Sequence, residues 1–193
     1  MELESFVPGP SGRPLSRRRF LQTSGVATAG ASSALLAACG GSGKKQDESA
    51  TAADIAILNS ALDLENTAIA AYTAGAPLLK GELVKLGREL LGQEKEHADA
   101  LSTTVTQLGG HPTRPKANYQ FPRTRTQRDV LRLANTIEHE AIVAYREALP
   151  RLSTADLRAT VASILTNEAE HVSVLLGALG RPQVPTAFVT GRS

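Results

Sequence analysis

The sequence predicts an all-α fold, a bundle of four helices with a long crossover between the second and the third. Three observations support this prediction. Aromatic residues make up only 4% of the 193 residues and Trp is absent, whereas Ala and Leu abound, which favours a helical core of small and aliphatic side chains. Apolar residues recur in steps of three and four along four segments, the spacing of one helix face. The second half of the chain also repeats the pattern of the first.

Residues 1–38 have the features of an export signal. The first motif resembles a twin-arginine signal and reads Ser16-Arg17-Arg18-Arg19-Phe20-Leu21-Gln22, with Gln22 where Lys is usual. The apolar run that follows, residues 25–38, is too short and too polar for a membrane-spanning helix. We therefore expect the twin-arginine export machinery to carry the protein out of the cytoplasm.

The single cysteine, Cys39, follows Leu36-Ala37-Ala38, and this order resembles the lipobox of bacterial lipoproteins. The resemblance implies cleavage before Cys39 and acylation of that residue, which would anchor the protein in the cell envelope, on the outer face of the cytoplasmic membrane. The alternative is a removed leader with an incidental thiol. Since Cys39 is the only cysteine, disulfides and thiolate metal sites within the chain are excluded. Residues 39–52 are rich in Gly, Ser, Lys and acids, and they are predicted to form a flexible tether.

The body of the chain carries no excess charge. Residues 1–38 contain four Arg and two Glu, and the remainder has 17 basic and 17 acidic residues. A neutral body gives no reason to expect nucleic-acid binding. The basic residues between positions 114 and 128 are interpreted as part of a solvated loop.

Capping and breaking residues define the four helices. A hydroxyl residue with Asp three positions later, which resembles a capping box, stands at three helix starts. These pairs are Thr51 with Asp54, Thr126 with Asp129, and Ser153 with Asp156. Together with Gly and Pro breaks, they predict helices near 52–78, 82–108, 127–149 and 154–179. The helical domain is therefore expected to span residues 53–180, with a C-terminal tail at 181–193.

The segment 109–125 is rich in Pro and has no periodicity, so we interpret it as the crossover. Helices of ~25 residues are ~38 Å long. An extended segment of this length reaches up to ~60 Å, at ~3.5 Å per residue. The crossover can therefore return along the whole bundle, between two hairpins with short turns.

Two Glu-x-x-His motifs lie on the predicted second and fourth helices, at Glu94–His97 and Glu168–His171. This spacing puts the acid and the imidazole on one face of a helix, one turn apart. Both motifs fall on the apolar seam of their helix, where a core-facing position should carry hydrocarbon. Polar side chains at such positions indicate a site inside the bundle.

The internal repeat adds one inward acid from each remaining helix. The segment 65–72 aligns with 138–145, and the Glu-x-x-His motif begins 29 residues after the first Glu in one half and 30 in the other. In an antiparallel hairpin, residues equidistant from the turn face each other, and the midpoints fall near residues 80 and 154, at the predicted turns. Six inward residues should therefore meet at one level: Glu65, Glu94, His97, Glu138, Glu168 and His171.

Four carboxylates and two imidazoles on seams without Lys or Arg favour a site for two divalent metal ions. Clustered carboxylates repel one another and are costly to desolvate, whereas two divalent cations balance four negative charges. Carboxylate and imidazole ligands suit Fe or Mn, and the sequence leaves open which of them is bound. It also leaves open which acids bridge the ions. A haem between His97 and His171 would leave four acids unexplained.

Two tyrosines extend the predicted site. Tyr72 and Tyr145 lie two turns beyond Glu65 and Glu138 on the same seams. A core tyrosine in such a place bonds its hydroxyl to a ligand carboxylate, and a redox role is the alternative. Four residues fall off the seams and are expected to face solvent: Glu96, His139, Glu140 and Glu170.

On these motifs the chain resembles the ferritin-like superfamily over roughly residues 53–180. The stretch Ile57-Leu58-Asn59-Ser60-Ala61-Leu62-Asp63-Leu64-Glu65 is similar to its desiccation-associated and bacterial ferritin-like branch. The resemblance implies a ferritin-like four-helix bundle. In that family the two motif acids would be terminal or bridging ligands, each motif histidine would cap one metal, and Glu65 and Glu138 would complete the pair. The family uses such centres for ferroxidase, peroxide and oxygenation chemistry, so the fold does not fix the reaction.

We therefore expect an exported di-metal-carboxylate protein that oxidises Fe(II) or handles peroxide or oxygen, with no catalytic groups beyond its metal ligands. The alternative is a non-enzymatic envelope protein for stress or desiccation protection, or a scaffold, with a structural metal site. No further helix is predicted after residue 180, so a storage cage is not indicated. A monomer or a small homo-oligomer is expected.

Overall fold

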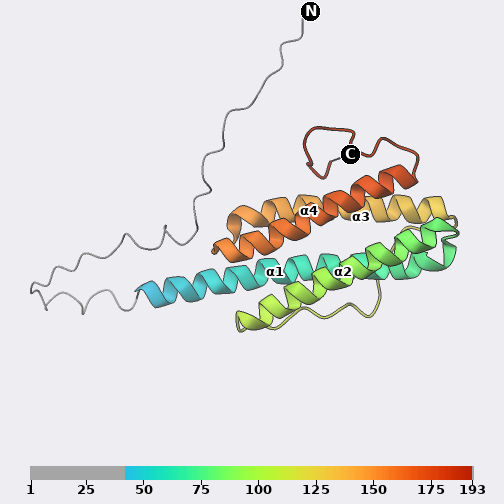
Figure 1. Ribbon diagram of the computed structural model, residues 1–193. Coiled ribbons are helices and arrows are strands. Elements are labelled where there is room, and N and C mark those ends of the chain that lie inside the picture. Colours follow the sequence, from blue (N-terminus) through green and yellow to red (C-terminus); the bar gives the residue numbers. More distant parts are fainter. Residues whose placement is uncertain (1–41, 193) are drawn as a thin grey trace, which may run out of the picture. The chain divides into compact units, whose positions relative to one another are not determined.

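The structure is a computed structural model that describes residues 42–192. The export signal and Cys39 lie outside the described residues. Four helices form two antiparallel hairpins, α1 with α2 and α3 with α4 (Figure 1). Their bounds are α1 Ser42–Gly75, α2 Glu82–Gln107, α3 Gln127–Ala148 and α4 Ala155–Ala178. Short 3-10 turns follow α1 and α3, at Ala76–Leu78 and Leu149–Arg151. Residues 42–192 contain no strand, and the predicted all-α four-helix bundle is confirmed.

The chain between α2 and α3 returns along the bundle, so that α3 begins near the end of α1 (Figure 1). This crossover is fastened to α1 by side-chain bonds. Asn59 Nδ2 donates to the carbonyl of His111 at 3.0 Å, and Asn59 Oδ1 accepts from the amide of Thr113 at 2.7 Å. Further along, Lys116 Nζ lies 2.8 Å from Asp63 Oδ2. The long crossover thus follows α1, which orders a segment without secondary structure of its own.

α1 begins about ten residues before its predicted start, because the segment predicted as a flexible tether is helical from Ser42 onward. The residues at 44–50 include no Gly or Pro, so nothing in them opposes helix formation. Thr51 does not cap the helix. Its hydroxyl donates to the carbonyl of Asp47 at 2.9 Å, the bond made by a Thr inside a helix. Since segment 44–50 is polar apart from Ala50, it shows no apolar period that would reveal the helix.

The predicted cap of α3 is present, whereas that of α4 lies one residue later. Thr126 and Asp129 form a reciprocal capping box, in which each side chain accepts from the other's backbone amide. At α4 the cap is Thr154, whose hydroxyl accepts from the amide of Leu157 at 3.3 Å. Ser153 instead donates its backbone amide at 2.9 Å, and also its hydroxyl, to the buried carboxylate of Asp54. The start of α4 is therefore held by α1.

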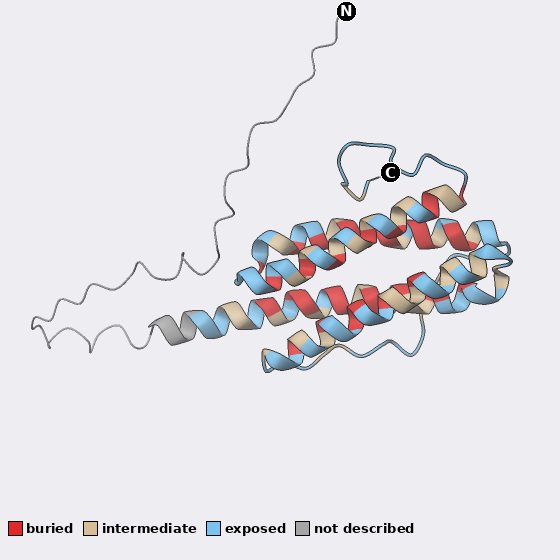
Figure 2. Ribbon diagram, in the orientation of Figure 1, coloured by how far each residue is buried: buried red, intermediate tan, exposed pale blue. Residues whose placement is uncertain are grey.

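The core consists of two apolar clusters at different levels of the bundle. Stretches of buried residues alternate with exposed ones along all four helices (Figure 2). The first includes Leu58, Leu101, Tyr145 and Val161. The second includes Tyr72, Leu90, Leu131 and Leu175. On each helix, the buried Glu or Glu-x-x-His motif falls between the residues of these two clusters. The polar residues therefore occupy a layer enclosed above and below by hydrocarbon.

After α4, the tail folds back towards α3. Arg146 Nη1 donates to the carbonyl of Thr190 at 2.8 Å. Gly191 packs so closely on α3 that an added Cβ would lie 2.6 Å from the carbonyl oxygen of His139. Among the helices of residues 42–192, none has the length and apolar character needed to cross a bilayer.

Candidate metal centre

The structure brings together the six inward polar residues that the sequence singled out. α1 and α3 each supply one acid, and α2 and α4 each supply an acid and a histidine one turn apart. The four carboxylates are at most 1% exposed, and even the more open histidine, His97, is only 9% exposed. These residues are Glu65, Glu94, His97, Glu138, Glu168 and His171. One layer of the bundle thus holds four acids and two imidazoles away from water.

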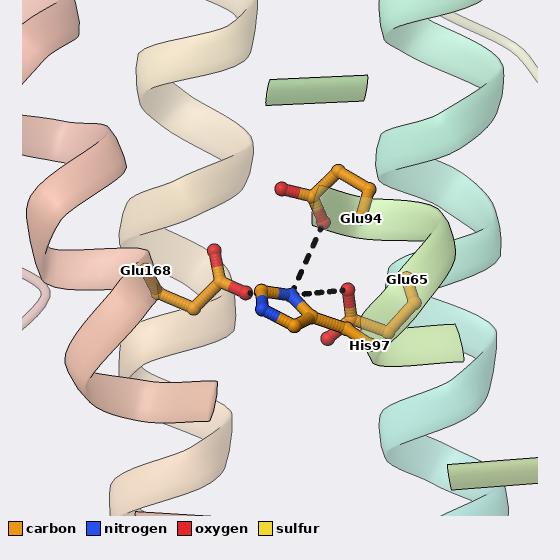
Figure 3. A group of neighbouring side chains, drawn as sticks. All are labelled: Glu65, Glu94, His97 and Glu168. Carbon is orange, nitrogen blue, oxygen red and sulfur yellow. Dashed lines mark ion pairs between the residues drawn. The ribbon is translucent and has the colours of Figure 1, made fainter. Parts of the chain in front are cut away.

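The first half of the centre gathers around His97 (Figure 3). Its Nδ1 lies 3.0 Å from Glu168 Oε1, 3.5 Å from Glu65 Oε2 and 4.0 Å from Glu94 Oε2. One ligand atom from each of these four residues lies within 4.8 Å of the others. They come from α1, α2 and α4, so this half spans three helices.

The second half gathers around His171 in the same way. Its Nδ1 lies 2.9 Å from Glu94 Oε1, 3.4 Å from Glu168 Oε2 and 3.5 Å from Glu138 Oε1. These four residues form a second group whose ligand atoms lie within 4.8 Å of one another. Glu94 and Glu168 belong to both groups, and each turns one oxygen to either histidine. The geometry thereby makes these two acids the candidates for bridging ligands, a distinction that the sequence left open.

The carboxylate oxygens and imidazole nitrogens of this layer are available to bind metal ions, because most of them make no hydrogen bond. Seven buried atoms make no hydrogen bond although they lie close together: Glu65 Oε2, Glu94 Oε1, His97 Nδ1, Glu138 Oε2, both Glu168 oxygens and His171 Nδ1. A buried polar atom without a partner is costly. Two groups of three carboxylates and one imidazole match the ligands of iron or manganese. The residues present therefore fit a pair of such ions.

Burial and mutual repulsion shift the pKa values of the buried acids in the metal-free protein. Burial raises the pKa of Glu94 to about 10 and that of Glu138 to about 8, and neighbouring carboxylates add to the rise. Burial also acts to raise the pKa of Glu168. Its contacts with His171 and His97 outweigh burial, however, and hold this pKa at about 2.

The two histidines respond to the same carboxylates. Burial acts to lower the pKa of His97, but its contacts with Glu168 and Glu65 raise it to about 10. Burial is outweighed in the same way at His171, whose contacts with Glu138, Glu168 and Glu94 raise the pKa to about 12. Without metal, this layer therefore holds protons that the unfolded chain would release at neutral pH.

Tyr72 and Tyr145 connect the two halves of the repeat. The hydroxyl of Tyr72 on α1 donates to Glu138 on α3, and the hydroxyl of Tyr145 on α3 donates to Glu65 on α1. Burial, reinforced by these carboxylates, raises both tyrosine pKa values, so both hydroxyls keep their protons. Each tyrosine thus holds the acid of the opposite half, leaving one oxygen of that acid free to bind an ion.

The off-seam residues divide into two kinds. Glu96, Glu140 and Glu170 are exposed, as predicted. His139 was also predicted to face solvent, but it is half-buried, and its Nδ1 lies 2.7 Å from the carbonyl of Asn135. Residues of the folded C-terminal tail lie beside His139 on α3. The sequence pattern could not show this, because the tail has no periodicity.

Gln93 is a site residue that the sequence pattern did not reveal. Its Oε1 lies 2.7 Å from His171 Nε2. Since an amide oxygen only accepts, His171 Nε2 must carry the proton and donate. In the neutral ring, Nδ1 is then bare and faces the carboxylates. The signal that was available is the position of Gln93 directly before Glu94 in the motif.

The centre is most accessible between α2 and α4, which are the least closely packed of the four neighbouring helix pairs. A hollow of about 450 Å³ on this face reaches His97 and is also lined by Ile164, Asn167 and Glu170. A smaller hollow of about 160 Å³ reaches His171 and includes Gln93. Small ions and molecules therefore have a short path to the centre from this face.

Comparisons with known proteins agree with this geometry. A family described as "Ferritin-like domain" matches residues 53–181. A conserved hypothetical protein from Mycobacterium tuberculosis superposes with a TM-score of 0.64 at 26% identity, covering 66% of this chain and 98% of its own. Bacterioferritin from Rhodobacter capsulatus, described with a metal-free dinuclear site and haem iron, gives 0.62 at 28% identity, covering 67% and 84%.

A further solved structure shows the same fold. A ferritin-like, diiron-carboxylate protein from Bacillus anthracis superposes with a TM-score of 0.61 at 24% identity, and the match covers 67% of this chain and 97% of that one. The chain matches none of the curated proteins.

Proposed function

The chain belongs to the ferritin-like domain family, and on that premise we propose that it is a di-metal-carboxylate protein that oxidises Fe(II) with peroxide or O2. Glu65 and Glu138 would be terminal ligands, Glu94 and Glu168 bridging ligands. His97 and His171 would each bind one ion. The likeness of residues 57–65 to the desiccation-associated and bacterial ferritin-like branch supports a place for the chain in that branch. A monomer or small homo-oligomer suffices, since one chain supplies all six ligands.

The observation that carries this proposal is that Glu94 and Glu168 belong to both ligand groups. Two carboxylates shared in this way would hold two ions close enough to act on one small molecule. Two Fe(II) ions bound there would supply one electron each, so that two Fe(II), one H2O2 and two protons would give two Fe(III) and two waters. Reduction of H2O2 by two electrons without release of a radical needs two adjacent Fe(II) ions, and shared acids are how this chain would provide them.

The protein's own residues prepare the centre for that chemistry. Four carboxylates carry four negative charges, which balance two divalent ions in a layer that is otherwise hydrocarbon. Tyr72 and Tyr145 fix the two terminal acids through their hydroxyls. The apolar clusters on either side exclude water, and the hollows between α2 and α4 admit ions and small oxidants.

The first test is metal content and oxidation. Anaerobic titration of the protein with Fe(II) should reach two bound ions per chain at equilibrium. Addition of H2O2 or O2 should then produce Fe(III) faster than the same iron free in solution, followed by absorbance. Two bound ions that are not oxidised under either condition would contradict the redox function and favour the structural, protective role of the metal. The same titration with Mn(II) compares the two candidate metals.

We also propose that the protein is exported by the twin-arginine route and anchored through acylated Cys39. The order and spacing of the two N-terminal motifs support this. Since the twin-arginine machinery carries folded proteins, the centre could be loaded before export. Mass spectrometry of the protein from the membrane fraction should show an N-terminus at Cys39 that carries acyl chains. An unmodified Cys39, or an uncleaved leader in that fraction, would contradict the anchor without affecting the metal centre.

A further inference from the structure

The two halves of the centre differ at one position. Within the repeat, Gln93-Glu94 on α2 corresponds to Asn167-Glu168 on α4. The residue before each bridging acid is therefore a carboxamide in both halves, but the side chain on α4 is shorter by one methylene group. All six proposed ligands match between the halves in type, so this difference stands out in an otherwise symmetric layer.

The longer side chain reaches across to the opposite histidine. Gln93 Oε1 accepts from His171 Nε2 at 2.7 Å, which fixes the ring and leaves Nδ1 to face Glu94, Glu138 and Glu168. The side chain of His171 is only 1% exposed. The smaller hollow of about 160 Å³ that reaches this histidine also has Gln93 in its wall. Gln93 thus both orients His171 and covers its solvent side.

The shorter side chain does not make the equivalent contact. Asn167 Nδ2 donates to Glu170 Oε2 at 3.1 Å, on its own helix. His97 Nδ1 faces Glu168 at 3.0 Å, but no described residue makes a hydrogen bond to His97 Nε2, the atom equivalent to the one that Gln93 holds in His171. The side chain of His97 is 11% exposed and borders the larger hollow of about 450 Å³. His97 is therefore less restrained than His171 and lies nearer to solvent.

We propose that the two metal positions are not equivalent. Gln93 acts as a positioning residue that makes the Glu138–His171 position the tightly held one. The Glu65–His97 position, opposite the shorter Asn167, exchanges its ion with solvent through the larger hollow. This inference rests on the proposed function, since it assumes that the six residues bind two ions. It assigns different tasks to the two positions: one ion is retained, and the other is a divalent cation that enters and leaves.

Release of Fe(II) to a chelator measures this difference directly. Protein loaded anaerobically with two Fe(II) per chain is mixed with an excess of a chromophoric Fe(II) chelator, and absorbance is followed with time. We expect two phases of equal amplitude, one ion each, with rates at least ~10-fold apart. Two ions that leave in a single phase would overturn the inference but not the metal centre. Failure to bind two ions at equilibrium would instead contradict the proposed function.

Variants of the carboxamide pair assign the phases. Gln93→Ala should accelerate the slow phase by ~10- to 100-fold, the usual effect of removing a histidine's outer hydrogen-bond partner, and leave the fast phase unchanged. Gln93→Glu, which also accepts from His171 Nε2, should restore the slow phase. Asn167→Gln should slow the fast phase, because the added methylene lets the carboxamide reach His97. Asn167→Ala, the matched control, should change neither rate by more than about twofold.

Three results would overturn the proposal: a slow phase unaffected by Gln93→Ala, an acceleration of the fast phase instead, or a fast phase unaffected by Asn167→Gln. Thermal unfolding of each metal-free variant should stay near that of the unsubstituted protein. The substitutions can then be compared as changes in metal release rather than in folding.

Discussion

Glu94→Ala and Glu168→Ala should each abolish the oxidation of Fe(II) that the protein accelerates, whereas loss of one independent site would halve it. Each acid turns one oxygen towards His97 and the other towards His171, so its removal takes a ligand from both positions. Either variant should retain less than one Fe(II) per chain after desalting. Oxidation with H2O2 should fall to the rate of iron in solution. Metal analysis and stopped-flow absorbance measure the two effects.

The controls separate bridging acids from terminal and surface acids. Glu65→Ala removes a ligand from the His97 group alone, so it should still retain about one ion while losing oxidation that needs two. Glu96→Ala removes an exposed acid two residues from Glu94 and should keep both ions and full activity. If Glu94→Ala retains two ions, or Glu96→Ala loses them, the assignment of faces on α2 is wrong.

The metal-free protein should become less stable as pH rises from 4.5 to 8. The pKa values of Glu94 and Glu138 are raised above their ordinary 4.5, to about 10 and about 8. Their contribution to stability is therefore fully present below pH 4.5 and lost as pH rises through the raised values. His97 and His171, raised from 6.5 to about 10 and about 12, add a loss of the same sign above pH 6.5.

Glu168 does not change this direction. Its pKa is lowered to about 2, so its contribution is present above 4.5 and is lost only as pH falls towards 2. Each proton held in excess by the folded state lowers stability by ~1.4 kcal/mol per pH unit. The free energy of unfolding should therefore decrease by several kcal/mol across the range, a large part of a typical total.

Denaturant unfolding at pH 4.5 to 8, in the presence of a chelator, tests this prediction. Glu138→Gln should flatten the decline because an amide does not titrate. Glu140→Gln, which replaces the exposed acid two residues later on α3, should leave the decline unchanged. Protein loaded with two divalent ions should lack it, since the ions replace the protons. A metal-free protein whose stability is constant or rises over this range would contradict the predicted pKa directions.

The clustering of the six inward polar residues could be predicted from sequence because the pattern that places them is local. A Glu and a His three residues apart necessarily share a helix face, and the repeat places Glu65 and Glu138 at the same level. The bridging role of Glu94 and Glu168 could not be predicted in this way. It depends on how far α2 and α4 lie from each other, and no pattern within a single helix reports a distance between helices.

The features that were missed depend on contacts between segments or lack periodicity. Gln93 lies off the apolar seam of α2, and its role follows only from the proximity of His171 on α4. Ser153 resembled a helix cap, but the buried carboxylate of Asp54 on α1 binds it and leaves capping to Thr154. The early start of α1 was missed because the polar residues there form a helix without an apolar period.

The extended start of α1 also has a mechanical consequence. Asp54 is the first described residue of α1 with a buried side chain. The twelve residues before it, from Ser42 to Ala53, add a rod of ~18 Å to the start of the helix, at ~1.5 Å per residue. In a helix, unlike in an unstructured segment, the number of residues fixes the direction about the axis in which the end of the helix points. Deletion of one residue from segment 44–50 should rotate the N-terminal end of α1 by ~100° about the helix axis. Deletion of all seven residues should change this direction by no more than ~20° and shorten the helix by ~10 Å. The two deletions would thus change the direction and the length of the N-terminal end of α1 separately.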